Sequence, residues 1–275
     1  MEQLFSPISP LILALIVLSL VIASVGFRKT VWFISVGYAF AITGMVIVTV
    51  LVYRNQLTLI AGLQNVALLL WSLRLGIYLV RREATAKMPT SVNDQVARAQ
   101  SLPLMVKCFI WVSVSVLYVA MFSPSLFMLT APAQPTGLSA VIAWLGVIVL
   151  YGGLVIESVA DQQKSAFKLQ SPGRFCNVGL YRLVRCPNYL GEIMVWLGSW
   201  VIGLAIYNGI LQWVISLIGL ACITLIMMGS TKRLEKGQAQ RYGHLPEYQQ
   251  YITSVPVLFP FIPVYTLENV RVYIE

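Results

Sequence analysis

Leu138-Ser-Ala-Val-Ile-Ala-Trp-Leu-Gly-Val-Ile-Val-Leu-Tyr-Gly-Gly-Leu-Val-Ile-Glu157 is an almost wholly apolar stretch in which the first charged residue is Glu157. A helix needs about 20 mostly apolar residues to cross the hydrocarbon core of a bilayer. This stretch therefore predicts a transmembrane helix that reaches the cytoplasmic surface at Glu157.

Six further stretches meet the same criterion, at 8–27, 31–53, 57–80, 104–129, 189–207 and 209–229. Of the 275 residues, 58% are hydrophobic and 11% are charged, whereas a soluble domain carries about 25% charged residues. The mean hydropathy is +0.80. We therefore predict an all-α polytopic membrane protein, a bundle of seven transmembrane helices. We expect it in the bacterial inner membrane, or in the endoplasmic reticulum of a eukaryote.

The net charge of +9 follows the predicted spans, and no nucleic-acid partner is expected. Cytoplasmic loops of membrane proteins are enriched in Lys and Arg. With seven spans, the basic segments after the first, third, fifth and seventh fall on one face, and only Arg54 falls on the other. These segments contain Arg28, Lys29, Arg81, Arg82, Lys87, Arg98, Lys164, Lys168, Arg174, Arg182, Arg185, Lys232, Arg233, Lys236, Arg241 and Arg271. The N-terminus is therefore predicted outside and the C-terminus in the cytoplasm.

The four cysteines are not expected to pair, because two of them lie on the predicted reducing side of the membrane. The chain has no C-x-x-C pair and a single histidine, so no metal site is predicted. Since the polar connections are short, we expect residues 1–275 to form a single membrane domain. The proline-rich segment 254–263 is expected to pack back at the membrane surface.

Gly179-Leu-Tyr-Arg-Leu-Val-Arg-Cys-Pro-Asn-Tyr-Leu-Gly-Glu192 is a basic turn that leads into the sixth predicted span. Pro187 suits the first position of a helix, where its missing N–H would have no partner. The free N–H groups and positive dipole end of such a turn attract anions. Arg182 and Arg185 add forked donors suited to phosphate. The stretch predicts a site for a phosphorylated or carboxylated ligand at the cytoplasmic surface.

Four other polar features have both a structural and a functional interpretation. The residues at 157, 161, 164 and 168 share one helical face, either as a salt-bridged stripe or as a site. Arg74, inside the third span, either snorkels or faces inward toward an acidic or phosphate partner. Glu192 either stabilises the start of its helix or orients a ribose or amide. The cluster at 241–251 either anchors at the interface or closes over a ligand.

The core of the basic turn, Asn188-Tyr-Leu-Gly-Glu192, resembles the signature of the steroid 5-alpha-reductase-like membrane reductases, including their bacterial branch. The segment 157–168 resembles the cofactor helix of that family, 248–260 its C-terminal closing segment, and 71–74 a shorter N-terminal motif. The stronger part of the resemblance covers roughly residues 150–263.

This resemblance implies NADPH bound from the cytoplasm, with residues 138–263 as the cofactor-binding region and residues 1–130 on the substrate side. It also implies reduction of a C=C bond conjugated to a carbonyl in a lipid or sterol-like substrate, by hydride transfer to the beta carbon. The cofactor contacts carried over or inferred beside it are Glu157, Asp161, Lys164, Lys168, Arg182, Arg185, Asn188, Tyr189, Glu192, Tyr248 and Tyr251.

The N-terminal half departs from the steroid reductases, in which a Glu and a Tyr polarise the substrate carbonyl. No acidic residue lies between Glu2 and Glu83, so that Glu is missing. Tyr78, Arg74 and Glu83 are the candidates for its catalytic role. Cys186 also stands where many relatives carry His.

Two alternatives remain open at the level of sequence. Isoprenylcysteine and phospholipid methyltransferases share a similar Arg-His-Pro-x-Tyr turn and bind S-adenosylmethionine at the same kind of surface, although Cys186 removes the histidine. A non-catalytic, lipid-binding membrane protein would also retain such a turn. In each case membrane lipids are the expected partners, and the sequence does not fix the oligomeric state.

Overall fold

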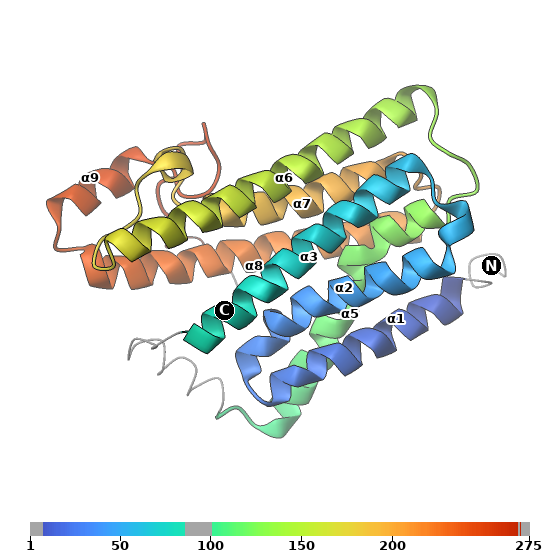
Figure 1. Ribbon diagram of the computed structural model, residues 1–275, viewed down its shortest axis with the longest axis horizontal. Coiled ribbons are helices and arrows are strands. Elements are labelled where there is room, and N and C mark those ends of the chain that lie inside the picture. The colour runs from blue at the N-terminus through green and yellow to red at the C-terminus, as the bar shows by residue number, and fades with distance from the viewer. Residues whose placement is uncertain (1–7, 86–100, 269, 271–275) are drawn as a thin grey trace. The chain divides into compact units, whose positions relative to one another are not determined.

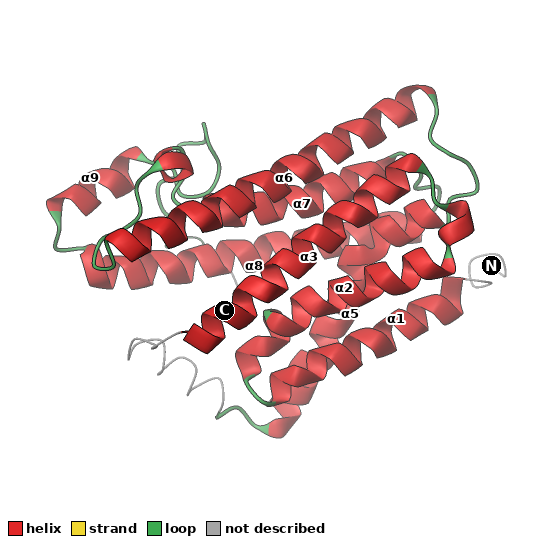
Figure 2. Cartoon of the chain, in the orientation of Figure 1, coloured by secondary structure: helices red, strands yellow, loops and turns green. Residues whose placement is uncertain are grey.

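The computed structural model describes residues 8–85, 101–268 and 270, and it contains helices but no strand within these ranges (Figures 1 and 2). Lys87, Arg98 and Arg271, which the charge argument used, lie outside the described residues. The chain divides into two compact units, each of which is described by itself. The first comprises Met1–Val141 and Gly203–Gly219, and the second comprises Ile142–Ile202 and Leu220–Glu275.

Four long helices build the first unit: α1 (Ile8–Ala23), α2 (Val36–Val52), α3 (Leu59–Thr85) and α5 (Leu104–Leu129). Short 3-10 turns at Ser24–Phe27, Thr30–Ile34 and Arg54–Gln56 lie in the connections. Large apolar side chains from several of these helices are fully buried, including Leu15, Ile42, Trp71 and Phe122. Helices are the expected elements here, because a spanning segment must satisfy its backbone hydrogen bonds internally.

Polar side chains link the helices of the first unit at a few buried points. The hydroxyls of Thr43 and Ser72 lie 2.8 Å apart and join α2 to α3. Ser125 Oγ donates to Asn65 Oδ1 at 3.0 Å and joins α5 to α3. Such pairs satisfy groups that would otherwise be costly to hold in an apolar environment.

The second unit is built mainly from α6 (Gly137–Gln170), α7 (Pro187–Leu204), α8 (Ile210–Tyr242) and the short α9 (Pro246–Ser254), with a 3-10 turn at Gly179–Arg182. Helix α6 has 34 residues and α8 has 33, so each is about 50 Å long at 1.5 Å per residue. Because a hydrocarbon core is about 30 Å thick, both helices continue beyond their apolar stretches. Their extensions carry the charged residues of the site.

Helices α6 and α7 pack backbone to backbone through pairs of glycines, in an antiparallel arrangement. A Cβ added at Gly153 would lie 2.6 Å from Gly191 O, and one added at Gly198 would lie 2.3 Å from Leu150 N. Similarly, a Cβ at Gly191 would lie 2.6 Å from Glu157 N. Small residues allow this close approach of membrane helices. The contact fixes the first turns of α7 against the end of the apolar part of α6.

Six helical segments among the described residues are long and apolar enough to cross a membrane. They correspond to the first five predicted spans and the last one, and they support a multi-pass membrane protein. The predicted span at 189–207 corresponds to helix α7, which has only 18 residues and carries the polar residues Asn188 and Glu192 near its start. It is not among the six segments that meet the criterion. The count of seven and the orientation of the termini therefore stay predictions.

Candidate functional site: a basic cavity beside the start of α7

A cavity of about 200 Å³ lies within the second unit, where the extensions of α6 and α8 approach the loop before α7. Its lining comes from α6, this loop, α8 and α9. The lining residues are Lys164, Lys168, Phe175, Cys176, Tyr181, Arg185, Leu234, Gln238, Arg241, Tyr242 and Tyr251.

The charge of this lining is entirely positive. Lys164, Lys168, Arg185 and Arg241 all contribute to it, and no carboxylate does. Among the described residues Lys164 forms no ion pair or hydrogen bond. Cations gathered at one cavity with low-dielectric walls raise the local concentration of anions. The cavity is therefore suited to an anionic ligand.

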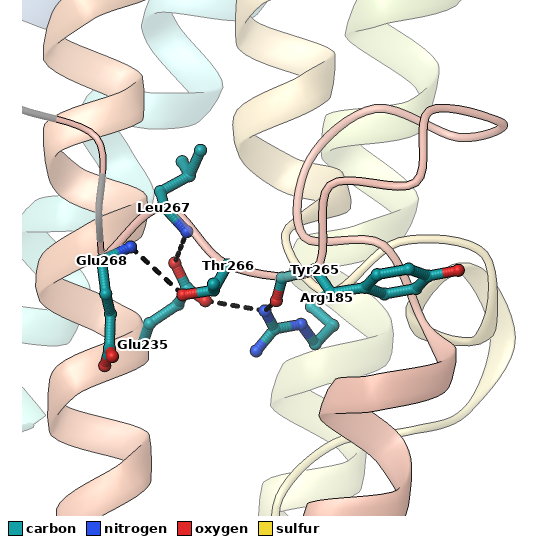
Figure 3. A network of polar contacts seen from close by, with 6 residues as sticks. All are labelled: Arg185, Glu235, Tyr265, Thr266, Leu267 and Glu268. Atoms are coloured by element: carbon teal, nitrogen blue, oxygen red, sulfur yellow. Dashed lines mark hydrogen bonds and ion pairs between the residues drawn. The ribbon is translucent and has the colours of Figure 1, made fainter.

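Arg185 is the most deeply placed of the four cations, with a relative exposure of 4%. Its Nη2 donates to Glu235 Oε1 at 2.7 Å and also to the Tyr265 carbonyl. Glu235 Oε2 in turn accepts from the Leu267 N–H at 3.0 Å, and Figure 3 shows this network. The Arg185 Nε is buried and has no hydrogen-bond partner among the described residues. Arg185 also belongs to the cavity lining, and a buried donor without a partner among the described residues calls for an explanation, of which a ligand acceptor is one.

Tyrosines and one phenylalanine form the wall between the loop and α9. The Phe175 ring packs against Tyr242, Tyr248 and Tyr251, with ring centroids 5.2–5.9 Å apart. Tyr251 donates its hydroxyl to the Tyr181 carbonyl at 2.7 Å. Burial raises the pKa of the Tyr248 and Tyr251 hydroxyls. These phenols therefore stay protonated and act as hydrogen-bond donors.

Lys168 connects the extension of α6 to this aromatic wall by hydrogen bonds. Its Nζ donates to the Tyr242 hydroxyl at 2.9 Å and to the Arg174 carbonyl. At the other end of the loop, Gly179 adopts φ +58° beside Gln163, and Gln163 Oε1 accepts from the Leu180 N–H at 2.9 Å. A residue with a Cβ would be strained at that φ and would meet the Gln163 side chain. Helix α6 thus holds the loop at Arg174 and at Leu180.

The two cysteines at the site are not activated nucleophiles. Burial raises the pKa of the Cys186 thiol to about 11, and it also raises the pKa of Cys176. A reactive thiol requires a lowered pKa. Both side chains therefore act as small apolar groups at neutral pH.

The structure brings together four of the predicted cofactor residues, Lys164, Lys168, Arg185 and Tyr251, in the cavity lining. Seven others are not part of the lining: Glu157, Asp161, Arg182, Asn188, Tyr189, Glu192 and Tyr248. Their surroundings differ, because Glu157, Glu192 and Tyr248 are buried, Arg182 is exposed and the remaining three are half-buried. The Asn188 Oδ1 atom is buried without a hydrogen-bond partner among the described residues.

The three predicted catalytic residues all lie on α3, in the first unit. Arg74 and Tyr78 are half-buried, and the Arg82 guanidinium lies 5.9 Å from the centroid of the Tyr78 ring. The Glu83 carboxylate forms an ion pair with Lys29. Their role at a substrate stays a prediction.

Sequence reasoning missed Phe175, Cys176, Tyr181, Leu234 and Gln238 as lining residues. A signal was available on α8, where Leu234, Gln238 and Arg241 follow one another at spacings of four and three residues. Such spacings place side chains on one helical face. No comparable signal marks Phe175 and Cys176, which reach the cavity through the path of the loop.

Fold and site together define a helical membrane protein with a basic, tyrosine-walled cavity in its second unit. The sequence profile of a protein family of unknown function, DUF1295, matches residues 15–255, and the chain therefore belongs to this family. An uncharacterized protein of Schizosaccharomyces pombe, C594.04c, is 29% identical over 138 residues. That match covers 42% of this chain and only 38% of the yeast protein. No solved structure matches the chain.

Proposed function

We propose that the chain is an NADPH-dependent membrane reductase that acts on a C=C bond conjugated to a carbonyl in a lipid or sterol-like substrate. The observation that carries this proposal is the cavity that the buried Arg185 and three further cations line, with no carboxylate among the lining residues. The resemblance of residues 157–168, 188–192 and 248–260 to the steroid 5-alpha-reductase-like enzymes supports the same ligand.

The residues present fit a phosphate-bearing cofactor. Arg185 and Arg241 offer forked donors and Lys164 and Lys168 offer point charges. The volume of about 200 Å³ is below the roughly 300–1,000 Å³ of pockets that hold whole drug-sized ligands. The cavity therefore suits the phosphate-bearing part of a dinucleotide. Asn188 lies outside the lining, but its Oδ1 has no hydrogen-bond partner among the described residues and is our candidate acceptor for a ribose hydroxyl or an amide N–H of the cofactor.

NADPH supplies a hydride when it is bound. The role of this chain is to hold the anionic part of the cofactor, exclude water and orient the remainder toward the substrate. The buried aromatic cluster around Phe175 forms a low-dielectric wall on one side of the cavity, and electrostatic interactions strengthen beside such a wall. Tyr78 and Arg74 on α3 stay the sequence-based candidates for polarising the substrate carbonyl, a role in which donors act most strongly where water is excluded.

The same cavity is poorly matched to S-adenosylmethionine. The methyl donor carries a positively charged sulfonium, whereas every charged residue of the lining is a cation. Like charges at close range repel, more so in a partly buried site. The charge of the cavity therefore favours the reductase over the methyltransferase.

The test is a thermal-shift titration of purified protein in detergent with NADPH and with S-adenosylmethionine, followed by NADPH oxidation with enone and enoyl lipids. A ligand that binds only the folded form raises its apparent stability. We expect a shift with NADPH and consumption of NADPH with at least one lipid. A shift with S-adenosylmethionine alone would establish methyl transfer instead. The absence of a shift with either would favour a non-catalytic, lipid-binding protein.

A further inference from the structure

The segment that follows α9 carries a turn with an unusually placed apolar side chain. Phe259-Pro-Phe-Ile-Pro263 forms the tip, and at its base the Val257 N–H donates to the Val264 carbonyl at 2.9 Å. Phe261 is 99% exposed. Its φ of +67° lies in the left-handed region, which is unfavourable for a residue with a Cβ. Packing among the residues that the structure describes accounts for neither its exposure nor its conformation.

Other apolar side chains around the same turn also face outward. Ile262, Val264 and Tyr265 are each between one third and one half exposed, and Figure 3 shows the Tyr265 ring directed away from the Arg185–Glu235 pair. Pro260 and Pro263 restrict the backbone of the turn. The result is a short, stiff apolar projection.

The position of this projection along the helices can be derived from its attachments. The N–H groups of Arg185 and Cys186 donate to the carbonyls of Pro256 and Val257 at 2.9 and 3.0 Å. Further along α7, Gly191 packs on Glu157, where the apolar stretch of α6 ends. Cys186 precedes Gly191 by five residues, and α7 runs antiparallel to α6. At 1.5 Å per residue, Cys186 therefore lies about 7 Å further from the apolar part of α6 than the contact between Gly191 and Glu157. The headgroup region extends about 5–8 Å beyond the hydrocarbon core on each side, so the turn is rooted at this depth.

The charges beside the turn complement a lipid surface. Arg182, three residues before Arg185, is exposed, and so is Arg233, two residues before Glu235. Basic side chains near a membrane surface are attracted to anionic headgroups. Aromatic side chains are enriched at the same level.

We propose that the turn Phe259–Pro263 is a membrane-interface anchor, with Phe261 and Ile262 inserted among the lipids of the leaflet in which α7 begins. Arg182 and Arg233 contact the headgroups of that leaflet. The lipid bilayer is thus the partner of this surface. The anchor holds the segment whose Tyr265 carbonyl and Leu267 N–H contact Arg185 and Glu235, so membrane attachment and the cavity wall are linked. This inference is independent of which ligand the cavity takes.

The test uses the full chain in phosphatidylcholine–phosphatidylglycerol vesicles, with Cys108→Ser and Cys222→Ser to remove the two partly exposed thiols. The environment-sensitive fluorophore NBD is attached to Phe261→Cys and, separately, to Ile262→Cys. His244→Cys, exposed after the end of α8, is the aqueous control. Ile148→Cys, 65% exposed in the apolar part of α6, is the hydrocarbon control.

At positions 261 and 262 we expect blue-shifted emission, protection from iodide, and quenching by shallow spin-labelled lipids roughly threefold greater than at 244. Quenching at 148 should instead be strongest with deep spin labels. Emission and iodide quenching equal to those at 244 would overturn the proposal. Blue-shifted emission without quenching by any spin-labelled lipid would also overturn it, because a protein surface would then cover the turn.

Discussion

Arg185 and Glu235 form a buried ion pair in which Nη2 lies 2.7 Å from Oε1, and each side chain is more than nine-tenths buried. The pair joins the loop before α7 to the extension of α8. The Tyr265 carbonyl and the Leu267 N–H attach the C-terminal segment to the same two side chains (Figure 3). Three segments distant in the sequence therefore meet at one charged contact beside the cavity.

Replacing Glu235 with alanine should destabilise the protein by about 3–5 kcal/mol, because it leaves the Arg185 charge buried without its counter-ion. Glu235→Gln keeps an acceptor for Leu267 and should cost less. Lys236→Ala, at the exposed neighbouring position, is the control and should be near neutral. Thermal unfolding in detergent measures the stability of all three variants. Equal losses of stability in Glu235→Ala and Lys236→Ala would contradict a stabilising role for the Arg185–Glu235 ion pair.

Lys164→Gln should weaken NADPH binding by about tenfold, since it removes one of the cavity's cations without creating a large void. Arg182→Gln is the matched control, because Arg182 belongs to the same basic region but is exposed and outside the lining. The affinity of the Arg182→Gln variant for NADPH should change little. Titration at two ionic strengths measures both effects, and the affinity of Lys164→Gln should depend less on salt than that of the unmodified chain.

Asn188→Ala should also weaken NADPH binding, by several-fold, because its buried Oδ1 has no hydrogen-bond partner among the described residues and, in our proposal, accepts from the cofactor. Asn177→Ala changes an exposed asparagine of the same loop and serves as the comparison. If position 188 behaves like position 177 in titrations, its assignment to the cofactor is wrong.

Gly153→Ala should destabilise the protein by about 1–3 kcal/mol through overpacking. The added methyl would lie 2.6 Å from both Gly191 O and Val195 N, whereas at the adjacent Gly152 it would meet only Met194 Cε at 3.6 Å. Gly152→Ala should therefore be tolerated. Unfolding curves of the two variants provide the comparison, and a loss of the same size at both positions would argue against the close α6–α7 contact.

Stability should fall between about pH 9 and 11, partly because burial raises the pKa of Cys186 from 9.0 to about 11. Below pH 9 the thiol is protonated in both folded and unfolded chains, so its contribution is complete. As the pH rises, the unfolded chain loses the proton first, and stability declines by about 2–3 kcal/mol. Cys186→Ala should flatten this part of the profile. Identical slopes in both proteins, measured by unfolding at several pH values, would exclude the thiol as a cause.

The positions of most helices could be predicted from the sequence because a long apolar stretch is a local property. The predicted span 104–129 coincides with α5, and residues 138–157 lie within α6. The helical face carrying Lys164 and Lys168 was also predictable, since spacings of four residues place side chains together. Helix α7 was harder, because its polar first turn makes its length and apolarity marginal for a span.

The cavity itself depends on contacts between distant segments, which no local pattern encodes. Arg182 and Arg185 look equivalent in the sequence, but hydrogen bonds to the C-terminal segment hold Arg185 in the interior, whereas Arg182 is exposed. Likewise, Glu235 becomes the partner of Arg185 only because the extension of α8 passes beside the loop before α7. The resemblance to reductases pointed to the region that contains the cavity, but it did not distinguish these two arginines.

The most direct test of the proposed NADPH site is a fluorescence titration of NADPH against the purified chain and its Lys164→Gln/Lys168→Gln variant. We predict saturable binding to the unmodified chain and an affinity at least about tenfold lower for the variant, with a smaller effect for Arg182→Gln. Absence of binding to the unmodified chain, or equal affinity in all three proteins, would contradict the assignment of this cavity to NADPH.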